Sequence, residues 1–144
     1  MKILVGVDES DMSTHTLRRA LQLAERLDAE LEVAHAAYIP ATVLAAMGGV
    51  PLNMEDIVAG QRRAVWAGLE SVLGEAKVPV SRVDLDGYPP DALTDYAGTS
   101  GADLIVVGTR GRGPIASMVL GSTSHRIVNN APCDVLVVRS REER

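Results

Sequence analysis

Glycine and hydroxyl residues that could hold a phosphate group gather between residues 103 and 130. An aliphatic run, 104–107, is followed by Gly108, Arg110, Gly111, Arg112, Gly113, Gly121, Ser122, Thr123 and Ser124. Glycine lets backbone amides approach an anion closely, and the first amides of a helix, with its dipole, favour negative charge. A strand that ends in a glycine-rich turn and leads into a helix therefore predicts a phosphate site.

Each part of this stretch has an expected role. Because glycine adopts a positive φ at little cost, we expect Gly108 and Gly111 to point successive amides at one anion. Ser122 would cap the helix that follows. Arg110 and Arg112 would either add charge-assisted contacts or remain solvated loop charges.

Two common nucleotide signatures do not fit the stretch. The pattern GxxxxGK[ST] fails because Pro114 follows Gly113 where a lysine is needed. The pattern GxGxxG is missing after the first apolar run, which continues into VDES at residues 7–10. The P-loop and the dinucleotide-binding fold are thereby excluded.

The elements that must position the loop follow from hydrophobic periodicity. Strands are predicted at 2–7, 30–36, 78–85, 103–107 and 134–138, with helices at 12–27, 53–73, 89–101 and 122–130. Strands that alternate with helices predict an α/β fold, a Rossmann-like doubly wound parallel sheet with helices on both faces. We expect the strand order 3-2-1-4-5, with strand 3 at an edge. Ligands in such sheets bind at the carboxyl ends of the strands, where Val7 and Asp8 would meet Gly108.

Composition narrows the class of protein. The 144 residues predict a single domain over 1–144, with an aliphatic core, because the chain has no Phe and only one Trp and three Tyr. A net charge of −5 argues against nucleic-acid binding. One cysteine excludes a disulfide framework, and no apolar run approaches the length of a membrane span. We expect a cytoplasmic protein without membrane contact. The apolar segment 37–52 is hard to place, and its Met47–Gly49 region is either a lid over the ligand or a partner surface.

The spacing Gly-x2-Gly-x9-Gly-Ser, at Gly108, Gly111, Gly121 and Ser122, resembles the ATP-binding motif of the universal stress protein family. The resemblance covers the whole chain. It includes Asp8 and Ser10 after the first strand, His35 near the end of the second, and the closing segment APCDVLVVR at 131–139.

This resemblance implies an ATP-binding stress-response regulator that acts through nucleotide-dependent association. It implies ATP with Mg²⁺, Asp8 and Val7 near the nucleoside, Ala36 beside adenine, and a homodimer that pairs through the strand at 134–138. Strand 134–138 is apolar and would lie at a sheet edge, which is a template for pairing. The implied binding residues are Val7, Asp8, Ser10, Ala36, Gly108, Arg110, Gly111, Arg112, Gly121, Ser122 and Thr123.

Other interpretations stay open from the residues alone. The chain could hydrolyse ATP slowly or phosphorylate itself at Ser122, Thr123 or Ser124, although no lysine or arranged base stands in the loop. It could also be a structural dimer module whose ligand is incidental. Asp8 could act as a helix cap or lie near the magnesium ion, and His35 is expected to pack rather than catalyse. One loop does not separate ATP from ADP, AMP or cyclic AMP.

Overall fold

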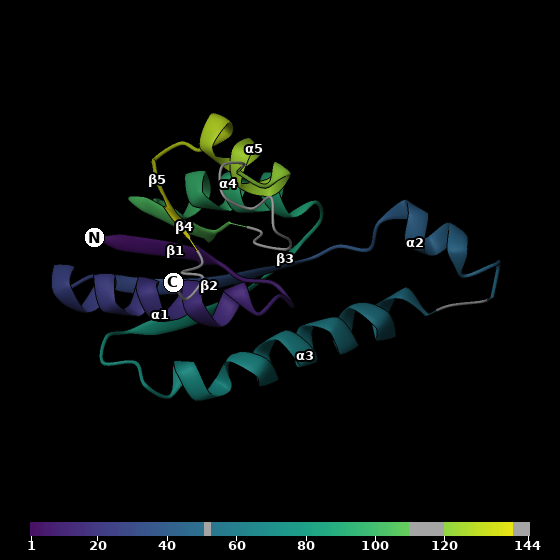
Figure 1. The fold of residues 1–144 in the computed structure, drawn as a ribbon, viewed down its shortest axis with the longest axis horizontal. Helices are drawn as coiled ribbons and strands as arrows, with labels where there is room; N and C mark the ends of the chain where they lie inside the picture. The colour runs from purple at the N-terminus through teal and green to yellow at the C-terminus, as the bar shows by residue number, and fades with distance from the viewer. Residues whose placement is uncertain (51–52, 110–119, 140–144) are drawn as a thin grey trace, which may run out of the picture.

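A five-stranded parallel sheet organises the chain (Figure 1). The computed structural model describes residues 1–50, 53–109 and 120–139. Its elements are β1 (Lys2–Gly6), α1 (Met12–Leu27), β2 (Glu30–Ala37), α2 (Ala41–Ala46), α3 (Met54–Leu73), β3 (Val80–Asp86), α4 (Pro89–Ser100), β4 (Leu104–Gly108), α5 (Ser122–Asn130) and β5 (Asp134–Val138). The order β3-β2-β1-β4-β5 confirms the predicted fold class and strand order.

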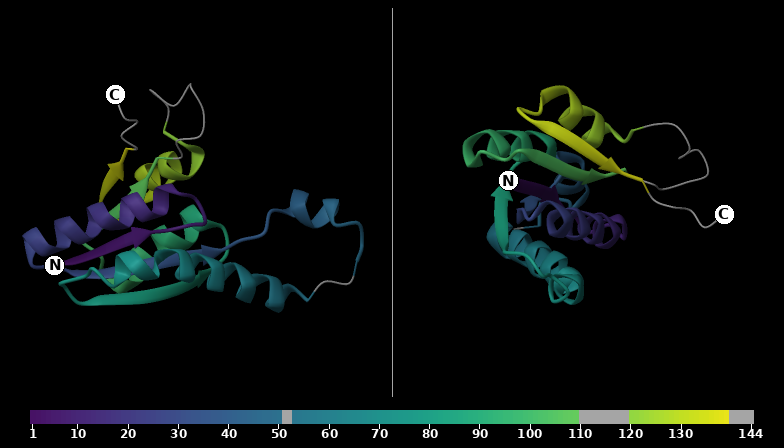
Figure 2. Two further views of the ribbon diagram at one scale, coloured as in Figure 1. Left: turned by 60° about the horizontal axis from the view of Figure 1, so that its bottom comes forward. Right: turned by 90° about the vertical axis from the view of Figure 1, so that its left-hand side faces the viewer.

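Helices cover both faces of the sheet (Figure 2). On one face, α1 and α3 bury a core with Ile3 and Val5 of β1. On the other face, α4 and α5 pack over Leu4 and Ile105. Successive side chains of a strand point to opposite faces, so strands buried on both sides read as continuous aliphatic runs.

The predicted boundaries hold within two residues, but one helix was missed. β3 begins at Val80 rather than at 78, because Pro79 has no amide hydrogen and contributes only its carbonyl, which accepts from Leu31 N at 2.9 Å. Within segment 37–52, residues Ala41–Ala46 form the short helix α2, which buries none of its side chains. The sequence of α2 has no amphipathic pattern, so this helix could not be predicted from hydrophobic periodicity.

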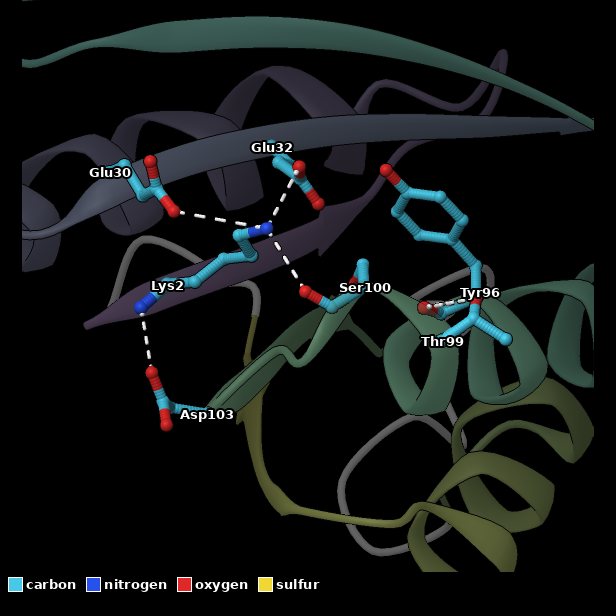
Figure 3. A network of polar contacts seen from close by, with 7 residues as sticks. All are labelled: Lys2, Glu30, Glu32, Tyr96, Thr99, Ser100 and Asp103. Carbon is cyan, nitrogen blue, oxygen red and sulfur yellow. Dashed lines mark hydrogen bonds and ion pairs between the residues drawn. The ribbon is translucent and has the colours of Figure 1, made fainter.

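A polar network closes the end of the sheet where the strands begin (Figure 3). The Lys2 Nζ donates to the carbonyl of Ser100 at 3.0 Å and lies 3.4 Å from a Glu32 carboxylate oxygen. The Lys2 amide donates to Asp103 at 2.8 Å. These contacts join β1, β2 and the end of α4 at the amino ends of the strands.

An arm projects beyond the carboxyl ends of the strands. It consists of α2 and the first turns of α3, and Figures 1 and 2 show both extending away from the sheet. Its exposed apolar side chains are Val43, Leu44, Met47, Val50 and Met54. Within the described ranges, none of the helices combines the length and hydropathy that crossing a membrane requires.

Candidate functional site

Two adjoining hollows lie at the carboxyl ends of β1, β2 and β4. The smaller, of about 80 Å³, lies between β1, β4 and the start of α5. The larger, of about 650 Å³, lies between the β1–α1 loop, the end of β2 and α3. Both are lined by Asp8, Ser10, Met12, Ala36 and Pro89, so they form one continuous cleft. Its position is the one that a doubly wound sheet offers to ligands.

The structure brings together most of the predicted binding residues that it describes. Those that line the smaller hollow are Val7, Asp8, Ser10, Ala36, Gly108 and Thr123. Gly121 and Ser122 begin α5 beside it without lining it. Arg110, Gly111 and Arg112 lie outside the described residues.

Gly108 is required for a close approach rather than for a positive φ. It is the last residue of β4, and its φ is not positive, so the expectation of a positive φ at Gly108 was wrong. A β-carbon added at Gly108 would lie 2.6 Å from the Thr16 Oγ1 of α1. The following amide, of Thr109, donates to Val138 O at 2.9 Å and is therefore occupied by β5.

The start of α5 differs from the predicted cap. Gly121 is the N-cap, and Ser122 is already the first helical residue, so the prediction that Ser122 caps the helix was wrong. Ser124 is 1% exposed, and its hydroxyl donates to Gly108 O at 2.9 Å. This bond fixes the helix start against β4. It also removes Ser124 as an accessible phosphoryl acceptor.

The first amides of α5 remain suited to an anion. The earliest intrahelical bond runs from His125 N to Gly121 O at 2.9 Å. The amides of residues 122–124 precede it and have no partner four residues back in the helix. With Thr123 at the cleft, this helix end supplies donors and a favourable dipole.

Asp8 organises the turn after β1. Its Oδ1 accepts from the Ser10 amide at 2.8 Å and from the Ser13 hydroxyl at 3.0 Å. The Asp8 amide in turn donates to Ser13 Oγ at 2.7 Å. The N-cap of α1 is Asp11, so Asp8 does not cap that helix. Its carboxylate is held at the boundary of the two hollows.

The larger hollow contains polar groups that the sequence analysis did not assign to a ligand. His35 is 2% exposed, and its Nδ1 is buried without a hydrogen-bond partner. Burial lowers the pKa of His35, although Glu9, Asp84 and Asp8 oppose the shift and Arg62 reinforces it. The imidazole is therefore neutral at neutral pH.

Gln61 and Thr16 were also missed. Gln61 lines the larger hollow and Thr16 the smaller. Gln61 stands four residues before Val65 on the buried stripe of α3, and Thr16 directly precedes the buried Leu17 of α1. A polar residue within an apolar helical stripe is the signal that could have identified both.

The part of the chain that the structure describes contains no metal site built from protein side chains alone. There, no group of three or more His, Cys, Asp or Glu side chains is arranged to hold a metal ion. Magnesium is commonly held by one or two carboxylates together with substrate phosphates. The cleft offers Asp8 for that mode.

Comparison with known proteins decides the family. A model described as the universal stress protein family matches residues 1–139. The chain belongs to the universal stress protein family. The Bacillus subtilis universal stress protein YxiE is 32% identical over an alignment 145 residues long. The alignment covers 96% of this chain and 98% of that protein.

Solved universal stress proteins share the fold and include nucleotide complexes. One, described as a complex with cAMP, is 27% identical with a TM-score of 0.72 and 96% of each chain covered. Another, from Archaeoglobus fulgidus in complex with dAMP, is 25% identical with a TM-score of 0.68, covering 95% of this chain and 96% of that one.

A double-mutant cycle tests the close approach at Gly108. Gly108→Ala should lower the free energy of unfolding by about 1–3 kcal/mol, because its β-carbon would overlap the Thr16 hydroxyl. Thr16→Ala removes that oxygen, so the double variant should recover most of the loss. Urea unfolding of the four proteins measures the coupling. Additive losses would contradict the contact.

Stability should depend on pH through His35. Its pKa in the folded protein lies below the value of about 6.5 in an unfolded chain, so the unfolded state takes up the proton first as pH falls. The contribution is present above about pH 6.5 and is lost as pH falls through the two values. His35→Gln removes it. Urea unfolding between about pH 5 and pH 8 should give a shallower pH dependence for the variant, and parallel curves would refute the assignment.

Proposed function

We propose that this universal stress protein binds ATP, with Mg²⁺, in the continuous cleft and acts as a regulator through nucleotide-dependent association. The observation that carries the proposal is the convergence of six predicted binding residues on one hollow beside the start of α5. The complexes of relatives with cAMP and dAMP support an adenine nucleotide as the class of ligand. The glycine motif supports a phosphate chain.

Charge orients the nucleotide within the cleft. The carboxylate residues Glu9 and Asp11 line only the larger hollow, whereas Asp8 lines both. Phosphate groups would be repelled in the larger hollow, whereas the helix start at the smaller hollow attracts them. The phosphates therefore belong beside Thr123 and the glycine motif, and the base belongs in the larger hollow.

The walls of the larger hollow suit a base. Ala36, Tyr38, Pro40 and Pro89 supply apolar surface, and a volume of about 650 Å³ falls within the range of small-molecule sites. Asp8 and Ser10 line both hollows, so in this proposal they are the residues beside the ribose that joins base and phosphates. Mg²⁺ would neutralise the phosphate charge, with Asp8 as the protein carboxylate at hand.

Association is proposed to occur through β5. This strand pairs with β4 on one side and forms an edge of the sheet on the other. Leu136 in its middle is 40% exposed. An apolar strand with free backbone groups is a template for pairing, and a two-fold axis at its centre would bring two copies of β5 together.

Nucleotide binding is tested with a glycine variant and a matched control. Gly111→Val should weaken ATP binding by at least about 100-fold, because a branched side chain would obstruct the close approach of phosphates to the motif. Gly68→Val is the control, since a β-carbon at Gly68 meets nothing within 4 Å. Isothermal titration with ATP and magnesium measures both, and mass spectrometry identifies any nucleotide that co-purifies. Wild-type protein that shows no saturable ATP binding would refute the proposal.

Dimerisation is tested at the β5 edge. Leu136→Lys should shift the protein from dimer to monomer, because a charge would be desolvated where two strands pair. Val128→Lys places the same charge on α5 at a side chain that is 46% exposed, and should leave the dimer intact. Sedimentation equilibrium distinguishes the two. A wild-type monomer at micromolar concentration, or a dimer in both variants, would rule out this interface.

A further inference from the structure

Gln61 lies where α3 leaves the sheet and meets the cleft. Val65, Leu69 and Val72, on the same helical stripe, are buried against the sheet. Gln61 continues that stripe by one more turn and lines the larger hollow. Its position is therefore set by three packed side chains of the same helix, which gives it a fixed place at the cleft wall.

The Gln61 carbonyl oxygen lacks a partner inside the protein. Oε1 is buried and accepts no hydrogen bond, and the same holds for Nδ1 of His35, which lines the same hollow. Buried polar atoms without partners are costly, and each one in a native protein calls for an explanation, such as a bound water, an ion or a functional contact. Gln61 and His35, which carry these two atoms, line the same hollow, and a ligand with a polar edge would give the atoms partners.

The base is the part of a nucleotide that brings such an edge. This step rests on the function proposed above, in which charge places the base in the larger hollow. An amide side chain matches adenine, because its carbonyl accepts from the exocyclic amino group while its NH₂ donates to a neighbouring ring nitrogen. His35, which lines the same hollow, has a lowered pKa and adds no positive charge there at neutral pH.

We propose that Gln61 is a specificity-determining residue that accepts a hydrogen bond from the adenine amino group. The contact selects nucleotides with a 6-amino purine. Removing the amino group from the ligand leaves the Gln61 carbonyl unpaired again, so the analogue binds more weakly although its sugar and phosphates are unchanged. Because the contact involves only the base, its effect appears in the ratio of the affinity for ATP to the affinity for an analogue without the amino group.

The test compares ATP with purine riboside 5′-triphosphate, which lacks only the amino group. Wild-type protein should bind ATP about tenfold more tightly, the value of roughly one net hydrogen bond. Gln61→Met keeps the side-chain length and removes the amide, and should reduce the ratio to about one. Gln22→Met is the matched control. Gln22 is exposed on α1, and its side-chain oxygen accepts a hydrogen bond from Arg19.

Each outcome decides a different claim. A wild-type ratio near one, or an unchanged ratio in Gln61→Met, overturns the role of Gln61 while leaving ATP binding intact. Failure of the wild-type protein to bind either nucleotide overturns the proposed function and the inference with it. Gln61→Leu serves the same purpose if Gln61→Met does not fold. The wild-type side-chain amide signal of Gln61 in NMR should also shift more with ATP than with the analogue.

Discussion

The cleft depends on the contact between Gly108 and the two helices beside it. Because Gly108 has no side chain, α1 can approach β4 closely. A β-carbon at this position would lie only 2.6 Å from Thr16 Oγ1. The carbonyl of the same residue accepts from Ser124 and holds the start of α5. One backbone position thus sets how near α1 and α5 come to the strand ends. Interiors are closely packed, so a change there displaces whole helices rather than a single side chain.

The sequence predicted the sheet well because buried parallel strands and amphipathic helices leave strong periodic signals. The bounds of α1, α5 and β5 are those expected from the sequence. α2 was missed because it buries nothing, so no stripe of apolar residues marks it. At the site, residue type predicted which strand ends would meet, but not how each residue is used. Gly108 serves packing instead of a positive φ, and the hydroxyl that anchors α5 belongs to Ser124 rather than Ser122. Such choices depend on contacts between distant segments, which local patterns do not encode.

The alternation of β2 explains how one short strand serves two sides of the cleft. His35 continues the face of Val33, toward α1 and α3, whereas Ala36 continues the face of Ala34, toward α4. Neighbouring residues thus reach opposite faces of the sheet at the same height. Carboxylates gather on the α3 side, and helix-end donors gather on the α5 side. Under the proposed function, this asymmetry would orient a ligand with one neutral end and one anionic end before any specific hydrogen bond forms.

The arm described above shares a helix with the base side of the cleft. α3 runs without interruption for 20 residues, from Met54 at the arm to Leu73 against the sheet. Met54 lies about 10 Å along the axis from Gln61, and a helix is stiff over this distance. Gln61 therefore lies between the first turn of α3, which carries Glu55 and Asp56, and the three buried side chains that hold the helix against the sheet. The arm and one wall of the larger hollow therefore belong to the same uninterrupted helix.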